Sequence, residues 1–518
     1  MKAIGKIRFI IFLLVLLSVD AFGQRYQANW QSLRQHPERA DKTSANKVHY
    51  ESTWESLAQS HVPKWFEDAV FGIYFHWGVY SVPAFGCWGG RNMYQPAGGV
   101  SEAWSHIDTN KYANTHDYVK KVYGEPGKEF GYKDFIPMFK AEKWDPDRWA
   151  ELFENAGADF AGPVAAHHDG FCMWDTKYDE YNSMKMGPHR DVVGEIIQAI
   201  RKHGMKTVAT FHQYTNWYFF NPGRKLCPEG VDVNNPEYAG LYGPVREFKG
   251  MWHEVPFSES FQKEWYNKVI EVIDKYRPDQ LWFEIGFSDP GCIGENYVKS
   301  ALAHYFNTAE KWSKEVVVTH KSNDLPRSCS VLDIEVGRFH EAKPNVWQTD
   351  IPLGSSWAYS PDATCRPIND IIDGIVDRKS KNGVTLLDVA PKADGTLPES
   401  QVEGLKKLGE WMRINKEALY ASKPAPFVEG GVDVAEAGSV RFTIKGDFLY
   451  AIDLEEPSSP EVIPGIKPIK GSKIKMLGSS KNLPWHLEGD NLVIEEIPES
   501  LPCDYAWSFK IQVREESR

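Results

Sequence analysis

The chain has 518 residues, which at about 100–200 residues per domain predicts two domains or one large barrel with an accessory domain. Its 42% hydrophobic and 25% charged residues are typical of globular proteins and exclude a disordered, collagen-like or polytopic membrane chain. A net charge of −12 gives no electrostatic basis for binding nucleic acid, so we expect no nucleic-acid partner.

The N-terminus has the pattern of an export signal. Three basic residues among the first eight precede an apolar run over 9–19, which is too short to span a bilayer comfortably. Ala21-Phe-Gly23 then fits the small residues that signal peptidase requires. We therefore predict a signal peptide over 1–23 and an exported protein, periplasmic or secreted, with an uncleaved anchor as the alternative. No later run approaches about 18 apolar residues, so we expect no membrane contact after cleavage.

The seven cysteines are scattered, and no two of them form a C-x-x-C pair. This spacing predicts neither a zinc ribbon nor a thioredoxin motif. Export would permit a disulfide, but a core of this size does not need one. We predict that the cysteines are mostly free and buried.

Beyond a polar N-terminal arm over 24–60, short β-rich runs alternate with longer amphipathic stretches. The predicted strands cover 70–76, 159–167, 207–212, 280–284, 316–319, 331–335, 345–349 and 384–389. Predicted helices between them include 146–156, 191–203, 259–275 and 295–314. This rhythm predicts a (β/α)8-like barrel over 61–424. A doubly wound sheet, the alternative, would normally carry a glycine-rich phosphate loop where this chain has His76-Trp-Gly78.

The pattern changes near residue 424. From 425 to 518 helical spacing disappears, and short strands are predicted over 439–445, 448–454, 473–476, 492–496 and 505–512. This pattern is typical of a small antiparallel β-sandwich. The sandwich could bind sugar or support the barrel by packing, and its Trp485 and Trp507 suit a core.

Polar side chains gather where the predicted barrel strands end, and barrel enzymes place their catalytic groups at the carboxyl ends of strands. The chain sets there His76, the His167-His168 pair, His212, Glu284, the Asp333-Ile-Glu335 stretch and Asp350. A single histidine at a strand end is more often a packed core residue. Four of them, converging with carboxylates and tryptophans, indicate a functional site.

Two kinds of site fit this set. Histidines and carboxylates can bind a metal, but an amidohydrolase-like barrel would place His-x-His on strand one, where this chain has only His76. We also expect the adjacent His167 and His168 to point in opposite directions along a strand. Neutral imidazoles and abundant aromatic rings instead suit a sugar, and two carboxylates can hydrolyse a glycoside. We expect no metal and no cofactor, with a metal-dependent hydrolase as the alternative.

Longer motifs carry a family resemblance. They are Phe75-His-Trp-Gly78 within 65–83, His-His-Asp-Gly-Phe over 167–171, Gly-Pro-His-Arg-Asp over 187–191, and the stretches 347–350, 354–359, 381–383 and 388–395. From about residue 50 to its end, the chain resembles the α-L-fucosidases of glycoside hydrolase family 29. The resemblance implies an irregular (β/α)8 barrel with a C-terminal β-sandwich. It also implies a retaining, metal-free hydrolase that releases terminal α-L-fucose from oligosaccharides or polysaccharides.

The resemblance assigns sugar-binding roles one residue at a time. Three histidines match the family's fucose-binding histidines, and further residues match aromatic or polar walls of the sugar pocket. The residues implied to bind the sugar are His76, Trp88, His167, His168, His212, Trp217 and Trp357.

The implied catalytic pair departs from the family pattern in one member. The acid/base matches Glu335, within the stretch 333–338. The family nucleophile is normally an aspartate, whereas the aligned residue here is Glu284, whose extra methylene moves the carboxylate by about 1.5 Å. Asp289 is the alternative nucleophile. Retention predicts carboxyl groups about 5–5.5 Å apart, with Glu335 in the more apolar or more negative surroundings.

A second departure follows the first strand. Many family members carry a G-S-E-W-Y-P-R-N-M-Y-like stretch whose Glu and Trp contact the sugar, and this chain has Gly86-Cys-Trp-Gly-Gly-Arg-Asn-Met-Tyr94. The Glu is missing, Trp88 keeps the Trp role, and Gly89-Gly90 is expected to open local space. These changes favour terminal α-L-galactose, which is L-fucose with a hydroxyl on C6, or a sulfated or otherwise decorated fucoside. A catalytically silent carbohydrate-binding protein on the same scaffold is the alternative from another class.

Overall fold

The structure is a computed structural model that describes residues 49–96, 115–245, 256–284, 293–321, 325–428 and 431–514. The predicted signal peptide, the arm up to residue 48, Asp289 and Cys292 lie outside these residues. Within them, no helix is long and apolar enough to cross a membrane.

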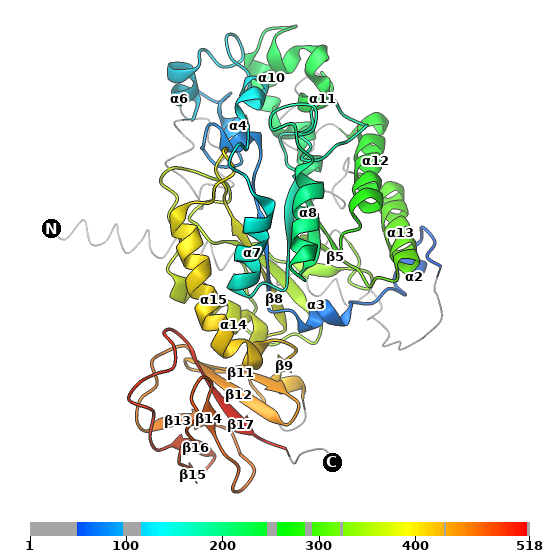
Figure 1. The fold of residues 1–518 in the computed structure, drawn as a ribbon. Coiled ribbons are helices and arrows are strands. Elements are labelled where there is room, and N and C mark those ends of the chain that lie inside the picture. The colour runs from blue at the N-terminus through cyan, green and yellow to red at the C-terminus, as the bar shows by residue number, and fades with distance from the viewer. Residues whose placement is uncertain are drawn as a thin grey trace, which may run out of the picture.

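Eight parallel strands close into a barrel in chain order (Figure 1). They are β1 (Phe71–Phe75), β2 (Phe160–Ala166), β3 (Lys206–Phe211), β4 (Gln280–Phe283), β5 (Val317–Lys321), β6 (Val331–Asp333), β7 (Trp347–Pro352) and β8 (Gly383–Val389). Each overlaps its predicted run, so the (β/α)8-like barrel is confirmed and the doubly wound sheet is excluded, because β8 pairs with β1.

Helices form the outer layer of the barrel. The long ones are α7 (Pro146–Ala156), α8 (Val192–Lys202), α12 (Glu259–Tyr276), α13 (Glu295–Trp312), α14 (Ile368–Ser380) and α15 (Glu399–Leu419). Shorter ones are α2 (Trp54–Leu57), α3 (Lys64–Asp68), α4 (Gly89–Asn92), α6 (Thr115–Val122), α9 (Asn216–Phe219), α10 (Asn221–Leu226) and α11 (Ala239–Tyr242). The 3₁₀ helices are η2 (Val79–Ser81), η5 (Tyr132–Met138), η6 (Gln213–Thr215), η7 (Asp232–Asn234), η8 (Pro236–Tyr238) and η9 (Ala425–Phe427).

Local sequence explains why α7 matches its predicted bounds. The Asp145 side chain accepts hydrogen bonds from the backbone N–H groups of Asp147 and Arg148, which caps the first turn. Pro146 occupies the first helical position, where its missing N–H costs no hydrogen bond. Gly157 ends the helix at a φ of 91°, a left-handed conformation that glycine adopts without strain.

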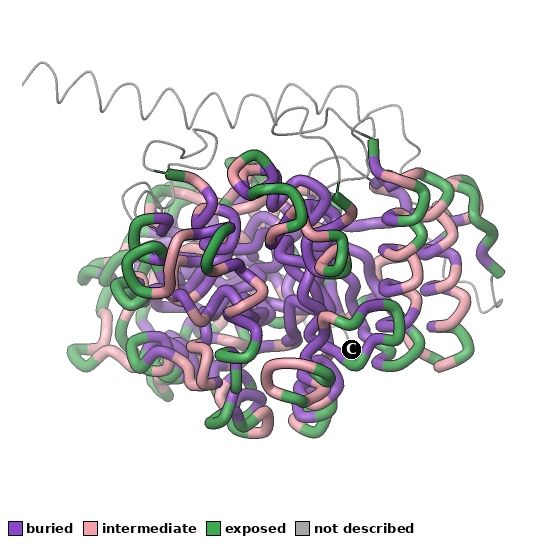
Figure 2. The backbone as a smooth tube through the Cα atoms, turned by 90° about the horizontal axis from the view of Figure 1, so that it is seen from above, coloured by how far each residue is buried: buried purple, intermediate pink, exposed green. Residues whose placement is uncertain are grey.

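The barrel interior combines an apolar cluster with a buried polar contact. Phe160, Val208, Val317, Val331 and Leu386 are fully or almost fully buried in this cluster. Gln280, at the start of β4, donates across the barrel to Gln348 of β7 at 2.8 Å. Figure 2 shows the same arrangement from above, with buried backbone in the centre and exposed backbone mainly at the periphery. This packing makes the barrel a solid support for the groups at its carboxyl end.

Antiparallel sheets follow the barrel, as predicted. One sheet has the order β10 (Glu436–Ala437), β11 (Val440–Lys445), β12 (Phe448–Asp453), β17 (Trp507–Gln512) and β14 (Lys475–Met476), with β9 (Lys423–Pro424) on β11. The other has the order β13 (Glu461–Pro464), β16 (Asn491–Ile494) and β15 (Trp485–Glu488). Trp507 is buried in the shared core and Trp485 packs against it, as expected.

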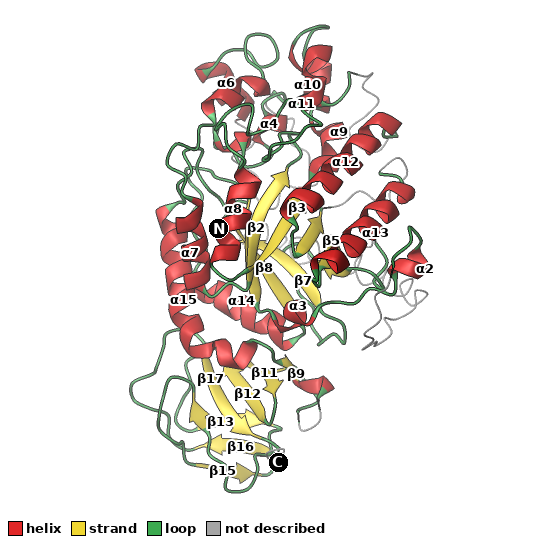
Figure 3. Ribbon diagram, turned by 45° about the vertical axis from the view of Figure 1, so that its right-hand side comes forward, coloured by secondary structure: helices red, strands yellow, loops and turns green. Residues whose placement is uncertain are grey.

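The sandwich packs on the barrel at the end from which the strands start, whereas the strand arrowheads point away from it (Figure 3). Trp411 of α15 donates its indole N–H to the carbonyl of Ala506 at 2.7 Å. Arg441 of β11 pairs with Asp377 of α14 at 2.6 Å. The sandwich therefore contacts α14 and α15 and lies opposite the carboxyl ends of the barrel strands.

The cysteines follow the prediction within the described residues. Cys87, Cys172, Cys227 and Cys329 are free and buried. Cys365 and Cys503 are free and half-buried. Disulfides therefore play no part in the stability of this part of the chain.

Candidate active site

Four histidines meet at the carboxyl ends of the first three barrel strands. His76 follows β1, His167 and His168 follow β2, and His212 follows β3. The ring of His76 lies 5.3 Å from that of His167 and 5.1 Å from that of His212. His168 lies 5.5 Å from His212, and each of the four is no more than 4% exposed. We call these residues the histidine cluster.

The expectation that His167 and His168 point in opposite directions is wrong. β2 ends at Ala166, and its register against β3 shifts between Val164 and Ala166. The two histidines therefore lie in the turn after the strand, where the alternation of side chains no longer holds. Their rings are 4.2 Å apart, and both contact His212.

Hydrogen bonds orient two of these imidazoles. Nδ1 of His168 lies 2.8 Å from the carbonyl oxygen of His212, and since a carbonyl only accepts, this nitrogen carries the proton. Nδ1 of His76 pairs with a carboxylate oxygen of Asp388 on β8 at 2.9 Å. No described residue hydrogen-bonds to Nδ1 of His167 or of His212.

Burial keeps the histidine cluster neutral. It lowers the pKa of His168 to about 3 and lowers the pKa of His76, His167 and His212 well below the usual value. The neighbouring imidazoles and the Lys321 ammonium lower these pKa values further. Neutral imidazoles can both donate and accept, which suits the hydroxyl groups of a sugar.

The two predicted catalytic glutamates converge on a lysine. Lys321, the last residue of β5, places its Nζ 3.0 Å from Glu284 after β4 and 3.0 Å from Glu335 after β6. It also lies 3.2 Å from Asp350 on β7. Glu284 in turn lies 3.4 Å from Nε2 of His212, which links the carboxylates to the histidine cluster.

The shared lysine limits the separation of the glutamates. Both distances are to Oε2 atoms, so these two oxygens are at most about 6 Å apart, which agrees with the spacing of about 5–5.5 Å in retaining glycosidases.

The surroundings of the two glutamates differ from the expectation. The side chain of Glu284 is 12% exposed and that of Glu335 is 20% exposed, so the more buried carboxyl is Glu284. Burial, together with the negative charges of Glu335 and Asp350, raises the pKa of Glu284 to about 8, although the ammonium of Lys321 opposes this rise. Two opposing effects of the fold therefore act on the predicted nucleophile.

Two of the three predicted tryptophans contact the histidine cluster. The Trp357 ring lies 5.7 Å from His76, and the Trp88 ring lies 5.2 Å from His168. Trp217, on α9, packs against Phe257 and Phe261 at 5.6 and 5.1 Å. The structure therefore brings Trp88 and Trp357 to the site, whereas these ring contacts of Trp217 are directed toward α12 and the residues before it.

The expected opening at Gly89-Gly90 is wrong. A Cβ on Gly90 would lie 2.6 Å from the ring of Tyr132, and a Cβ on Gly89 would lie 3.3 Å from Cβ of Phe85. Tyr132 donates its hydroxyl to Asp169 at 2.6 Å, which fixes the ring against Gly90. The space left by the missing side chain is therefore occupied by protein and gives no extra room for a sugar.

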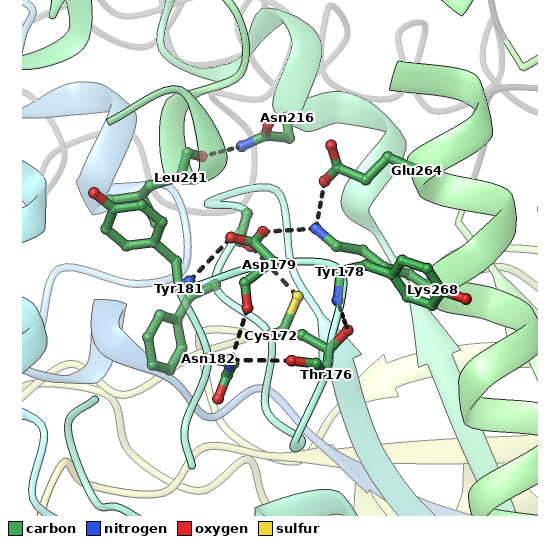
Figure 4. Close-up of polar contacts among 12 residues, drawn as sticks. Cys172, Thr176, Tyr178, Asp179, Tyr181, Asn182, Asn216, Leu241, Glu264 and Lys268 are labelled. Carbon is green, nitrogen blue, oxygen red and sulfur yellow. Dashed lines mark hydrogen bonds and ion pairs between the residues drawn. The ribbon is translucent and has the colours of Figure 1, made fainter. Parts of the chain in front are cut away.

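Buried polar contacts connect the segment after β2 to the helices beside it, and Figure 4 shows those of Asp179, Lys268 and Asn216. Lys268 of α12, fully buried, binds Asp179 at 2.7 Å and Glu264 at 2.6 Å. Asn216 donates to the carbonyls of His168 and Leu241 at 3.1 and 2.9 Å. These bonds tie the segment after β2 to the neighbouring helices and hold the backbone of His168 in place.

One group of residues has the chemistry of a metal site. His76, Cys87 and His167 are buried and place one ligand atom each within 4.8 Å of one another. Imidazole and thiolate are ligands that zinc prefers. Because His76 and His167 are also the residues implied to bind the sugar, a metal held there would compete with it.

Comparisons with known proteins agree with this site. The sequence profile of the family described as "Alpha-L-fucosidase" matches residues 37–417. The chain belongs to the α-L-fucosidase family. The tissue α-L-fucosidase of Bos taurus is 30% identical over 489 residues, which cover 89% of this chain and 91% of that protein. The human tissue α-L-fucosidase is 30% identical over 484 residues, with 89% and 91% covered.

A solved member of the α-L-fucosidase family has the same fold. The Thermotoga maritima α-fucosidase in complex with fucose is 29% identical, superimposes with a TM-score of 0.69, and covers 89% of this chain and 100% of its own. The predicted family, fold and glycosidase class are thereby confirmed. The roles of the individual residues remain predictions.

The sequence analysis did not identify two residues, Lys321 and Asp388, that the structure of this chain places at the site. The predicted fifth strand stopped at 319, whereas β5 extends to Lys321. Extending the run by two residues would have put a lysine at a strand end beside the histidines. Asp388 begins the motif over 388–395, but the motif alone gives it no role. Its position on β8 beside His76 depends on the closure of the barrel.

Proposed function

We propose that this chain is an exo-acting retaining glycosidase that releases terminal α-L-fucosyl or α-L-galactosyl units from oligosaccharides or polysaccharides. The observation that carries this proposal is the convergence of Glu284 and Glu335 on one ammonium group, with spacing suited to retention. The histidine cluster supplies neutral donors and acceptors beside them. A binder that performs no chemistry would not need two carboxylates at this spacing.

The mechanism assigns one role to each carboxyl. In the first step, Glu284 forms a bond to the anomeric carbon while the glycosidic bond breaks and Glu335 gives its proton to the leaving oxygen. In the second step, Glu335 takes a proton from water, which attacks the anomeric carbon and releases Glu284. The configuration at the anomeric carbon is inverted twice and so retained.

Fucose is the first candidate for the sugar, because the Thermotoga maritima relative was solved with fucose. L-Galactose remains the second candidate, because Cys87-Trp88 replaces the Glu-Trp pair that many family members use to contact the sugar. Loss of a carboxylate that binds a hydroxyl would cost about 1.5–3 kcal/mol of affinity for the original sugar. The filled space at Gly90 does not favour L-galactose further.

Hydrolysis of aryl α-L-fucoside and aryl α-L-galactoside side by side tests this proposal. We expect turnover of at least one substrate and a loss of about 10⁴-fold or more in Glu284→Gln, because the nucleophile is removed. Glu417→Gln is the matched control, since Glu417 on α15 pairs with Lys510 of the sandwich, away from the site. The preferred substrate identifies the sugar.

The other outcomes are informative. Activity that survives in Glu284→Gln would move the nucleophile to Asp289. No turnover of either substrate, combined with no labelling by 2-fluoro-fucosyl fluoride, would favour the silent carbohydrate-binding protein. Turnover of only a sulfated fucoside would point to the decorated substrate. Activity that chelators abolish would favour the metal-dependent hydrolase.

We also propose that the protein is exported to the periplasm or beyond. The support is the pattern of basic residues, apolar run and small residues over 1–23. N-terminal sequencing of the mature protein from fractionated cells should begin at Gln24. Recovery of intact Met1 in the membrane fraction would instead support the uncleaved anchor.

A further inference from the structure

We propose that Lys321 is a positioning residue that serves as the shared counter-ion of both catalytic glutamates. This inference rests on the proposed function. Its geometric basis is the ammonium group 3.0 Å from each of Glu284 and Glu335, on a side chain that is only 8% exposed. The ammonium also faces two indoles, with Nζ 5.1 Å from the ring centre of Trp282 and 5.7 Å from that of Trp357.

Lys321 remains charged in this setting. Burial alone would lower its pKa, but Asp350, Glu284 and Glu335 raise the pKa well above the usual value. Asp333, the last residue of β6, adds to this effect. The four histidines around it are held neutral by burial, as described above, and Asp388 faces His76. The ammonium is therefore the positive charge that the two glutamates share.

The reaction moves one negative charge between the two glutamates. The first step requires an ionised Glu284 and a protonated Glu335. After that step Glu284 is an ester, and Glu335 has lost its proton to the leaving oxygen. The pair thus carries one negative charge in both states, and a cation placed equally close to both can stabilise each state without moving. Lys321 meets this requirement.

Asp350 limits the effect of Lys321. It lies 3.2 Å from Nζ and accepts a hydrogen bond from Tyr74 at 3.0 Å, so it competes with the glutamates for the ammonium. Removing the charge of Lys321 and removing the charge of Asp350 should therefore change the pKa of Glu284 in opposite directions. This opposition distinguishes an electrostatic role from a packing role.

The test measures the rate of covalent labelling by 2-fluoro-fucosyl fluoride against pH. Labelling reports only the first step, which needs ionised Glu284. In Lys321→Gln we expect the rise of the labelling rate on the acid side of the pH profile (the acid limb) to move to higher pH by about one unit or more, since an opposite charge at this distance lowers a carboxyl pKa by about 1–3 units. Lys321→Arg keeps the charge, so its acid limb should lie at the same pH as that of the unmodified protein. In Asp350→Asn the acid limb should move to lower pH.

Each outcome decides the question. Lys379→Met is the control for removing a buried lysine, because Lys379 binds the carbonyls of Glu67 and Ala69 at the amino end of the barrel. It should leave the limb in place. If Lys321→Gln and Asp350→Asn both fold and the acid limb of their labelling rate stays at the same pH, the inference is overturned. If Lys321→Gln does not fold, the Asp350→Asn limb alone decides. Labelling that persists in Glu284→Gln would instead overturn the proposed function.

Discussion

The carboxyl end of the barrel and the C-terminal sandwich bury different kinds of side chain. At the barrel end, Lys321, Asp350 and Asp388 are buried beside the four neutral histidines. In the sandwich the buried core consists of apolar residues such as Phe442, Ile463 and Phe509. Its charged groups are mostly on the surface, as in the exposed pair of Lys467 and Asp490.

This difference separates the region that carries the chemistry, at the carboxyl end of the barrel, from the sandwich, whose buried core contributes stability. Buried ionisable groups cost free energy unless they are paired, so the three carboxylates that converge on Lys321 beside the histidine cluster indicate function. The sandwich contacts α14 and α15 at the opposite end and contributes none of the predicted site residues. We therefore expect substitutions in the two regions to affect different measurements.

The largest effect should come from the acid/base. Glu335→Gln removes the proton donor, so we expect a loss of about 10²–10⁴-fold for substrates with a poor leaving group. The loss should be much smaller for an aryl fucoside with an acidic phenol, which needs no proton. Rates measured over a series of leaving groups check this difference. Equal losses for all leaving groups would exclude Glu335 as the acid.

Next in size is a cavity in the sandwich. Phe509→Ala should reduce the free energy of unfolding by about 3–5 kcal/mol, because Phe509 is fully buried. The kcat/KM of the folded enzyme should stay within about twofold, whereas Leu487→Ala, at an exposed position, should change stability by about 0.5 kcal/mol or less. A large change of kcat/KM in Phe509→Ala would break the comparison between the two regions.

A smaller effect is expected from the partner of His76. Asp388→Asn weakens the bond that orients the imidazole, which should raise KM about 10- to 100-fold, the equivalent of about 1.5–3 kcal/mol. Asp453→Asn is the matched control, since Asp453 is buried in the sandwich and accepts from the backbone N–H of Glu455. Steady-state kinetics of both variants on one aryl fucoside sharpen the comparison.

The smallest effect concerns pH. Burial raises the pKa of Asp169 to about 7. Because the folded state holds this proton more tightly, its contribution to stability is present at low pH and is lost as pH rises through about 7. Asp169→Asn removes this titration. Between about pH 5 and pH 8 the Tm of the variant should therefore fall less than that of the unmodified protein, with about 2–4 °C for each kcal/mol of the free energy of unfolding. A parallel fall in both proteins would contradict the assignment.

Much of the fold could be predicted because its signals are local. The bounds of α7 follow from Asp145, Pro146 and Gly157, all within or beside the helix. β13 and β15 were missed because their residues are mostly exposed and lack the apolar alternation that marks a strand. Local patterning is sufficient where burial follows the period of the element, and insufficient where it does not.

The sequence by itself determined the family, the barrel, the sandwich and the histidines at the strand ends, since motifs and hydrophobic periodicity are written along the chain. Only the tertiary structure decided which carboxylates contact the same ammonium group. Lys321 comes from β5, Glu284 from the end of β4 and Glu335 from the turn after β6, and closure of the barrel brings the three together. It also decided that Tyr132 fills the space at Gly90. Coulomb interactions and packing depend on distances in space, which spacing along the chain does not specify.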